Sequence, residues 1–236
     1  MANTVFVSGS NRGIGKEIIK LFAEQGWNVI AHARAETNEF KELISDLGSK
    51  SGVSIIPVFF DMRDDSEMKE QIQNVVSKPK IEINALINNA GVMDVKLFMM
   101  ASMASIREIY DINLFSHMRI TQLLLKRMPA GSSIVNVASM DAYNPQRGES
   151  AYASSKAALC TWTEVLGKEL AGRIRVNAVA PNAVDTEMAK AIADKANWKL
   201  DDLIDAKSVA KTIYFLASDG SEAVTGEIIK IKGKQI

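Results

Sequence analysis

Short runs of apolar, β-forming residues alternate with segments of helical periodicity along the whole chain, and this alternation restricts the fold more than any other feature. The first run, 5–7, leads into a turn rich in glycine. Beyond that turn Ile14, Ile18 and Phe22 recur at helical spacing until Gly26. Strands and helices in this alternation form a parallel sheet that helices cover on both faces, with right-handed crossovers.

The same pattern predicts the bounds of each element. The expected strands are 5–7, 29–31, 53–60, 83–88, 133–138, 175–179 and 227–231. The expected helices are 14–25, 40–47, 68–76, 105–128, 150–170 and 208–216. Because 47% of its 236 residues are hydrophobic, the chain can build a substantial core. We expect one α/β domain over residues 1–236, with a doubly wound, Rossmann-type parallel sheet of about seven strands.

Three local features add predictions about the edges and the loops of this fold. The strand 53–60 contains Pro57, and a proline inside a strand favours the edge of a sheet. The second helix is expected to end at Gly48. The stretch 182–207 has the least regular pattern, and a connection of that length predicts a functional lid.

Charge and cysteine content argue against several classes of protein. The chain has 28 Lys and Arg against 28 Asp and Glu, so its net charge does not favour nucleic acid or an anionic membrane. Cys160 is the only cysteine, which excludes an intrachain disulfide and a thiolate metal cluster, and no metal site is expected. The segment before the first strand is too short for a signal peptide, and no apolar run reaches transmembrane length. We expect a cytoplasmic protein.

The glycine-rich turn joins the first strand to the first helix, where a parallel sheet binds the pyrophosphate of a dinucleotide. Its glycines are Gly9, Gly13 and Gly15. The common spacing Gly-x-Gly-x-x-Gly is absent, because Ile18 stands where the third glycine would be. Gly9 would permit a tight exit from the strand, and the other two would let the backbone approach a phosphate. The three glycines alone fit an ordinary strand–helix loop equally well.

A phenol and an ammonium form the candidate catalytic pair. Tyr152 and Lys156 lie four residues apart, on one face of an expected helix. A free phenol has a pKa of about 10, and a neighbouring cation lowers it towards neutral pH, where an acid/base catalyst works best. Alone, the pair also fits an exposed aromatic beside a solvated lysine. Its setting adds Ser139, at the end of a strand, and Asn113, in the helix after the fourth strand.

A set of motifs in fixed order makes the chain resemble the short-chain dehydrogenase/reductase family over essentially its whole length. The set comprises the turn 8–15, Asp61, Asn88-Asn89-Ala90-Gly91, Asn113, Ser139, Tyr152, Lys156 and the segment 181–186. Among family members, the likeness is greatest to 3-oxoacyl-acyl-carrier-protein reductases. One departure is Pro181-Asn182, where the family usually has Pro-Gly; asparagine tolerates a left-handed backbone.

The resemblance implies an oxidoreductase that reduces a carbonyl or oxidises the matching alcohol. Tyr152 would donate the proton to the carbonyl oxygen, and Ser139 would hydrogen-bond the same oxygen. Lys156 would lower the pKa of Tyr152 and bind the nicotinamide ribose, while Asn113 would hold a water that links the lysine to solvent. The implied cofactor-binding residues are Gly9, Asn11, Arg12, Gly13, Ile14, Gly15, Arg34, Asp61, Met62, Asn89, Ala90, Gly91, Tyr152, Lys156, Pro181, Asn182, Val184 and Thr186.

The residue that ends the second strand bears on the choice between NAD and NADP. NAD-binding relatives have an acidic residue there, which binds the hydroxyls of the adenosine ribose. Here the position is Ala33, followed by Arg34, and Arg12 adds a second cation in the glycine-rich turn. Two arginines suit a 2′-phosphate. Glu36 is a counter-candidate, although a carboxylate there also suits the start of the second helix. NADP(H) is therefore the expected cofactor, with Asp61 on its adenine by the resemblance.

Substrate and partners follow less directly. Carrier-protein reductases dock an acidic carrier on basic residues, and Arg173 lies at one such position, but 130–133 replaces the other basic segment. A 3-oxoacyl thioester, a free ketone, a sugar and a polyol all remain candidates, with acyl carrier protein as a candidate partner. Four methionines in 93–103 fit either a pocket wall or packing. Relatives pair helices 105–128 and 150–170 between subunits, so a homotetramer is expected.

Two further interpretations compete with an oxidoreductase. A dinucleotide-sensing regulator can use the same fold, although a sensor need not keep all four candidate catalytic residues. A serine hydrolase fits less well, because no Gly-x-Ser-x-Gly surrounds Ser139. The only histidines, His32 and His117, are expected to be structural.

Overall fold

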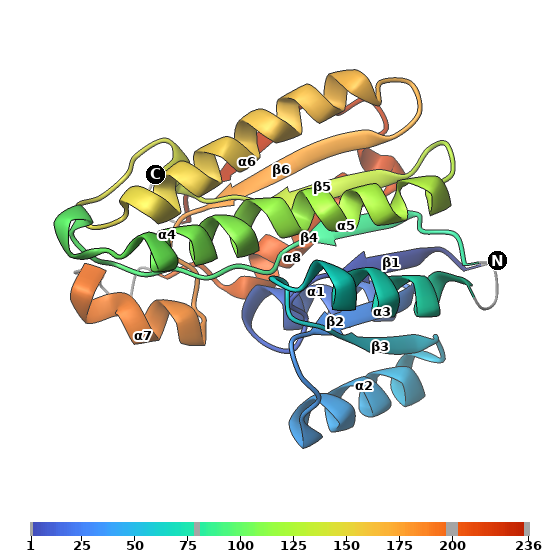
Figure 1. Ribbon diagram of the computed structural model, residues 1–236. Helices are drawn as coiled ribbons and strands as arrows, with labels where there is room; N and C mark the ends of the chain where they lie inside the picture. Colours follow the sequence, from blue (N-terminus) through green and yellow to red (C-terminus); the bar gives the residue numbers. More distant parts are fainter. Residues whose placement is uncertain (1, 78–80, 197–202, 234–236) are drawn as a thin grey trace.

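Seven parallel strands form one sheet in the computed structural model, which describes residues 2–77, 81–196 and 203–233 (Figure 1). They are β1 (Thr4–Val7), β2 (Asn28–Ala33), β3 (Ile55–Phe59), β4 (Ala85–Asn88), β5 (Ser133–Val137), β6 (Arg175–Pro181) and β7 (Ile228–Ile231). Their order across the sheet is β3-β2-β1-β4-β5-β6-β7. This order reverses between β1 and β4, and a ligand crevice is expected beyond the carboxyl ends of strands at such a point.

Helices cover both faces of the sheet (Figure 1). They are α1 (Gly13–Glu24), α2 (Asn38–Ser51), α3 (Asp65–Ser77), α4 (Met103–Tyr110), α5 (Ser116–Leu124), α6 (Ser150–Glu169), α7 (Glu187–Ala196) and α8 (Ala206–Ala217). Short helical turns are η1 (Phe98–Met100), η2 (Asp111–Phe115), η3 (Leu125–Arg127), η4 (Met140–Ala142) and η6 (Asp219–Ser221). Helices α1, α2 and α8 lie on one face, and α3, α5 and α6 on the other. Within the described residues, no helix has the length and apolar character needed to cross a membrane.

Alternate side chains of the strands fill two apolar cores, one on each face of the sheet. In β1, Val5 and Val7 belong to the core that α1 and α8 cover, whereas Phe6 belongs to the core that α3 covers. All three side chains are fully buried. Burial of one such side chain contributes roughly 1.5–3 kcal/mol, so the strand that leads into the glycine-rich turn is anchored on both sides.

The expected fold class and order of elements are confirmed, including the place of the strand with a proline. β3 ends the order of strands, and Pro57 lies opposite Ala31 of β2. A proline has no N–H to donate, which an edge strand tolerates because one of its sides has no partner strand.

The expected end of the second helix at Gly48 is wrong. Helix α2 continues to Ser51, and Gly52 closes it with φ of 70°. The Gly52 N–H donates to the carbonyl oxygen of Gly48 at 3.0 Å. A glycine at the closing position supplies the left-handed conformation, whereas one inside a helix only weakens it. The periodicity marked the wrong one of two nearby glycines.

The expected helix 105–128 is not uniform. It consists of α4, the π-helical turn η2, α5 and the 3-10 turn η3. The π turn contains Asn113, whose buried side chain holds Val92. A π turn inside a helix often marks a functional position, because it shifts the side chains that follow.

The stretch 182–207, which has the least regular pattern in the sequence, contains a helix, and its expected role as a lid stays a prediction. Its middle forms α7, and Thr186 precedes that helix and accepts a hydrogen bond from the N–H of Ala189 at 3.2 Å. A threonine that caps a first turn in this way favours a helix start. Val184 bridges Ile204, so the stretch returns towards the sheet. Residues 197–202 lie outside the described residues.

Candidate active site

A cavity of about 430 Å³ lies where β1, β4, β5 and β6 end. Its lining includes every residue that the sequence predicted to bind a cofactor. Three of the four predicted catalytic residues also line it, namely Ser139, Tyr152 and Lys156. Asn113 does not. Residues from distant parts of the chain therefore meet in one cavity, and their roles toward a cofactor stay predictions.

The glycine-rich turn is held by contacts that no other residue type would allow. A Cβ atom at Gly15 would lie only 2.0 Å from the carbonyl oxygen of Gly9, and Gly9 itself has φ of 66°. The Asn89 side chain donates to the carbonyls of Ser8 and Gly9, both at 2.9 Å. The absence of a side chain at Gly15 thus lets α1 pack against the turn. The expected role of that glycine in the approach of a phosphate stays a prediction.

His32 of β2 also holds the glycine-rich turn in place. Its Nδ1 accepts from the Gly9 N–H at 3.1 Å, and its Nε2 lies 3.0 Å from the carbonyl oxygen of Phe60, to which it donates. Burial lowers the pKa of His32 to about 4, so the ring is neutral and can accept at one nitrogen while it donates at the other. One imidazole therefore links the ends of three neighbouring strands, which agrees with the expected structural role.

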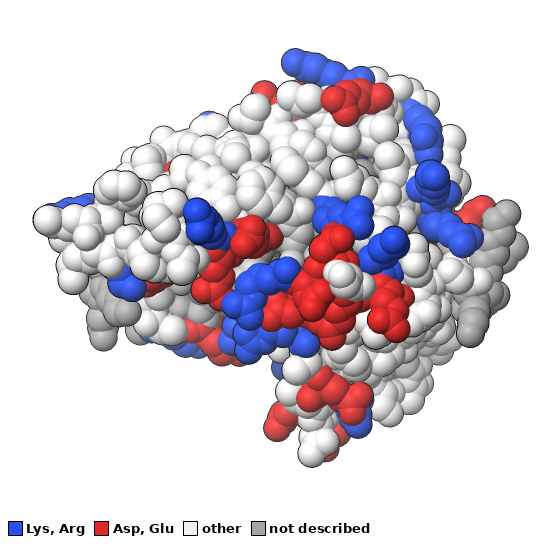
Figure 2. Space-filling view, in the orientation of Figure 1, with Lys and Arg blue, Asp and Glu red and all other residues white. Residues whose placement is uncertain are grey.

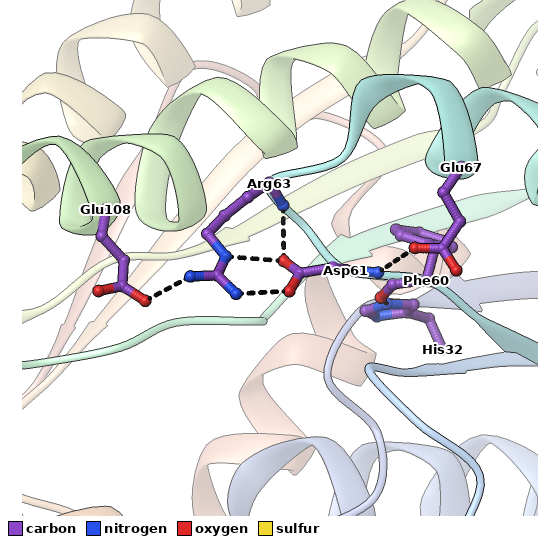
Figure 3. A network of polar contacts seen from close by, with 6 residues as sticks. All are labelled: His32, Phe60, Asp61, Arg63, Glu67 and Glu108. Atoms are coloured by element: carbon purple, nitrogen blue, oxygen red, sulfur yellow. Dashed lines mark hydrogen bonds and ion pairs between the residues drawn. The ribbon is translucent and has the colours of Figure 1, made fainter.

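A carboxylate and three arginines lie at one end of the cavity. Asp61 accepts from Arg63 at both carboxylate oxygens, and Arg63 also pairs with Glu108 at 3.0 Å (Figure 3). Hydrogen bonds from Arg63 lower the pKa of Asp61 to about 2. Arg12 and Arg34 are exposed, line the cavity and form no ion pair with the described residues. They are thus available to an anion.

Two neighbours of these arginines bear on the choice of cofactor. Ala33 ends β2 and is almost fully buried, so no carboxylate stands at the usual NAD-selecting position. Glu36 forms an ion pair with Lys41 of α2. This pairing agrees with the expected place of Glu36 near the start of that helix.

Charges of both signs lie side by side on the face of the molecule shown in Figure 2. Two of the ion pairs of the protein are Arg63 with Glu108, and Arg119 of α5 with Asp65 of α3. Because acidic and basic groups alternate in the middle of this face, that part of the surface presents no extended field of one sign.

Three of the predicted catalytic residues form the other, buried end of the cavity. Lys156 is 3% exposed, and its Nζ donates to the carbonyl oxygen of Val137 at 2.8 Å. The same nitrogen lies 5.9 Å from the centre of the Tyr152 ring. Tyr152 is buried in the first turn of α6, next to Ser139 at the end of β5. The helix and the strand end thus place a phenol, an ammonium and a hydroxyl together.

The pKa of Tyr152 is raised, which is the reverse of the lowering expected from Lys156. Burial is the main cause, and the carboxylate of Asp141 adds to it. Burial also lowers the pKa of Lys156 to about 8, because the same apolar surroundings disfavour its charge. In this structure, therefore, desolvation outweighs the attraction between the phenolate and the ammonium. Tyr152 holds its proton at neutral pH, as a proton donor must.

Asn113 is placed to hold the backbone beside the site. Its Oδ1 accepts from the Val92 N–H, and its Nδ2 donates to the Val92 carbonyl, both at 2.9 Å. The second N–H of the amide bonds to the Ser155 hydroxyl at 3.2 Å. These contacts occupy the side chain, so the expected water relay to Lys156 would need another atom of the residue, and it stays a prediction.

Asp141 is the residue of the site that the sequence reasoning missed. The Ser139 hydroxyl donates to Asp141 Oδ2 at 2.9 Å, and the Asp141 N–H donates back to Ser139 Oγ at 3.2 Å. The signal in the sequence was an acidic residue two positions after a serine that ends a strand.

Of the four methionines in 93–103, Met93 lines the cavity, whereas the other three are exposed.

The chain matches the family model described as short chain dehydrogenase over residues 3–197. It belongs to the short-chain dehydrogenase/reductase family. A curated relative, 3-oxoacyl-[acyl-carrier-protein] reductase FabG of Thermotoga maritima, is 34% identical and aligned over 96% of this chain and 95% of its own. The protein of that name from Chlamydia trachomatis is 31% identical over 98% of this chain and 96% of its own.

Solved structures agree with this assignment. A short-chain dehydrogenase/reductase mutant from Serratia marcescens superposes with a TM-score of 0.88 at 26% identity, covering 98% of this chain and 96% of that one. A short chain dehydrogenase from Burkholderia cenocepacia, in complex with NADP, gives 0.89 at 26% identity with the same coverages. As a family member the protein is an oxidoreductase, and the resemblance to this family that the motifs indicated is confirmed.

Proposed function

We propose that this protein uses NADPH to reduce a carbonyl group to a secondary alcohol, with Tyr152 as the proton donor. The observation that carries the proposal is the contrast between the two ends of one cavity. One end has a buried phenol that keeps its proton. The other has two exposed arginines, Arg12 and Arg34, and a buried alanine, Ala33, where a ribose-binding carboxylate would stand.

The residues at the arginine end fit a phosphorylated dinucleotide. Helix α1 begins at Gly13 without a side-chain cap, so its first N–H groups are free to bind a pyrophosphate. Arg12 and Arg34 would hold the 2′-phosphate that distinguishes NADP from NAD. The solved relative in complex with NADP supports this choice.

The residues at the buried end fit the proton chemistry of carbonyl reduction. NADPH bound in the cavity would supply the hydride. Tyr152 would give its proton to the carbonyl oxygen, and Ser139 would orient that oxygen by a second hydrogen bond. The Ser139 hydroxyl has a single proton, which Asp141 holds in this structure, so it must turn towards the substrate. Lys156 would bind the nicotinamide ribose and replace the proton that Tyr152 gives up.

The curated relatives and the contacts of Arg173 bear on which substrate and which partner the protein uses. The curated relatives named above make a 3-oxoacyl thioester one candidate, and a ketone of similar size is another. Arg173, the expected contact for an acidic carrier protein, is exposed, but its Nη2 already donates to the carbonyls of Leu125 and Met128. Carrier docking therefore draws limited support from this residue.

The test is oxidation of NADPH in the presence of candidate carbonyl compounds. The panel includes acetoacetyl-CoA, a carrier-bound 3-oxoacyl thioester and simple cyclic ketones, each tested with NADPH and with NADH. We expect NADPH-dependent turnover of at least one compound. A protein that binds NADPH tightly but reduces none of them would favour the sensor alternative instead.

We also propose that the protein assembles as a homotetramer through α5 and α6. Phe115, the last residue of η2 and directly before α5, is 53% exposed, and Val165 of α6 is 45% exposed. Apolar side chains of that size at the surface suit burial against a second copy. Light scattering at micromolar concentration should give a tetramer, and Phe115→Asp should yield smaller species. A monomeric wild-type protein would refute the proposal.

A further inference from the structure

Asp141 is a carboxylate inside the reaction end of the cavity that the proton chemistry above does not use. It belongs to η4, directly after β5, and lines the same cavity as Ser139, Tyr152 and Lys156. Its Oδ2 accepts from Ser139, whereas its Oδ1 has no hydrogen bond from the described residues. The carboxylate is half-buried, and it forms no ion pair with any of the described residues.

Binding of a substrate would remove the donor that Asp141 has. If Ser139 turns its single proton to the carbonyl oxygen, Asp141 Oδ2 loses the hydrogen bond that it accepts in this structure. A half-buried carboxylate without a donor is costly, so a new donor is favoured at this position. The substrate itself can supply that donor.

The neighbouring charges restrict what this donor can be. An anionic group on the substrate would be repelled by Asp141 itself. An ammonium would be repelled by Lys156, which lines the same end of the cavity. Burial raises the pKa of the Asp141 carboxyl, and the hydrogen bond from Ser139 and the charge of Lys156 act against that rise. A neutral hydroxyl can donate without either conflict. The Asp141 N–H donates to Ser139 Oγ, and this bond can persist while the Ser139 hydroxyl donates to the carbonyl oxygen. Asp141 then stays beside the carbonyl, so the hydroxyl that donates to it must lie close to the carbonyl as well.

We propose that Asp141 makes this site selective for ketones that carry a hydroxyl group on the carbon next to the carbonyl. The inference rests on the proposed function and narrows its substrate class. The carbonyl carbon accepts a hydride from NADPH, which is oxidised to NADP⁺, and the oxygen accepts the proton of Tyr152. The product is a vicinal diol, and the neighbouring hydroxyl keeps its own proton, which it donates to Asp141.

Most other side chains near the reaction end of the cavity are apolar, which suits a small substrate that makes one polar contact with Asp141. Val92, Met93, Met188 and Ile192 line the cavity and offer apolar side chains. Glu187 also lines it but is exposed at the start of α7. Asp141 is therefore the half-buried carboxylate beside the reacting groups, and Glu187 offers a matched control of the same charge.

The experiment compares two ketones of nearly equal shape, 2-hydroxycyclohexanone and 2-methylcyclohexanone, with acetoacetyl-CoA as a third substrate. The measured quantity is the ratio of kcat/KM for the hydroxyketone to that for the methylketone, with NADPH. We expect wild type to favour the hydroxyketone by about tenfold or more, as one hydrogen bond to a charged group predicts. In Asp141→Ala and Asp141→Asn the ratio should fall by about tenfold, and in Glu187→Gln it should not change.

The ratio separates selectivity from a purely structural role. If Asp141 only positions Ser139, both variants lower kcat/KM for the two ketones equally, the ratio stays constant and the inference is overturned. It is also overturned if wild type prefers the methylketone or reduces acetoacetyl-CoA alone, although the proposed function then stands. If wild type reduces neither these three compounds nor the carrier-bound thioester with NADPH, the proposed function fails with it. NADPH titration of each variant verifies that the cofactor end is intact.

Discussion

The two ends of the cavity contain the same kinds of charged group in opposite surroundings. At the arginine end, Arg12 and Arg34 are exposed, and Asp61 and Arg63 form a partly exposed pair. At the reaction end, Lys156 is buried and its pKa falls to about 8. Exposed cations keep their charge and suit a permanent anion, whereas a buried one gains or loses its proton near neutral pH. Changes at one end should therefore alter turnover, and changes at the other should alter which cofactor binds.

The largest effect is expected at the buried phenol. Tyr152→Phe removes the proton donor alone, so kcat should fall by about 10²–10⁴, the usual contribution of general acid catalysis. NADPH affinity, measured by fluorescence titration, should stay nearly unchanged. Tyr110→Phe is the matched control, because its hydroxyl donates to Ser154 outside the cavity. If Tyr152→Phe kept wild-type turnover, Tyr152 would not be the proton donor, and the buried end of the cavity would not control turnover.

Lys156 should affect both quantities, because it is proposed to touch the cofactor as well as the proton path. Lys156→Met keeps most of the buried volume and removes the ammonium. We expect kcat to fall and the Kd for NADPH to rise by about tenfold, as the loss of a charged hydrogen bond predicts. The turnover assay measures kcat, and fluorescence titration with NADPH measures Kd. A fall in kcat with unchanged NADPH affinity would contradict the contact with the ribose.

The arginine end is tested by reversal of cofactor preference. Wild type should bind NADPH about tenfold or more tighter than NADH, since each arginine can make a charge-assisted contact with the 2′-phosphate. The double variant Ala33→Asp, Arg34→Ala should prefer NADH. Arg63→Gln is the control, because Arg63 is already paired with Asp61 and Glu108 and should leave the preference unchanged. Tighter binding of NADH by wild type would sink the assignment.

A further effect at the buried end concerns the dependence of stability on pH. The folded pKa of Lys156 is about 8, below its ordinary value of 10.5, so the unfolded chain binds the extra proton between these values. The free energy of unfolding should therefore rise with pH from 8 towards 10, by at most about 1.4 kcal/mol per unit. Urea unfolding of wild type and Lys156→Met at several pH values isolates this contribution. Equal slopes for the two proteins would show that burial does not shift this group.

Sequence alone predicted what periodicity and motif order determine. Each strand and helix that it named exists, and the residues predicted to surround the cofactor do meet in one cavity. It failed where a choice depended on local capping, as with Gly48 and Gly52 or with Thr186 before α7.

Two features of the site required three-dimensional information. The pKa of Tyr152 is governed by burial, which spacing along a helix does not reveal. Asp141 contacts Ser139 through a short 3-10 turn whose geometry no periodic pattern describes. Both omissions concern the surroundings of a predicted residue and not its identity.

The proline in β3 has a consequence for the protein in a crowded solution. An edge strand offers a row of unpaired backbone groups on which a strand of another chain can grow, and such pairing is a common route to aggregation. Pro57 interrupts that row because it has no N–H, and it does so in the terminal strand of the sheet. Replacement of Pro57 by valine should leave the cavity intact yet shorten the time before concentrated protein becomes turbid.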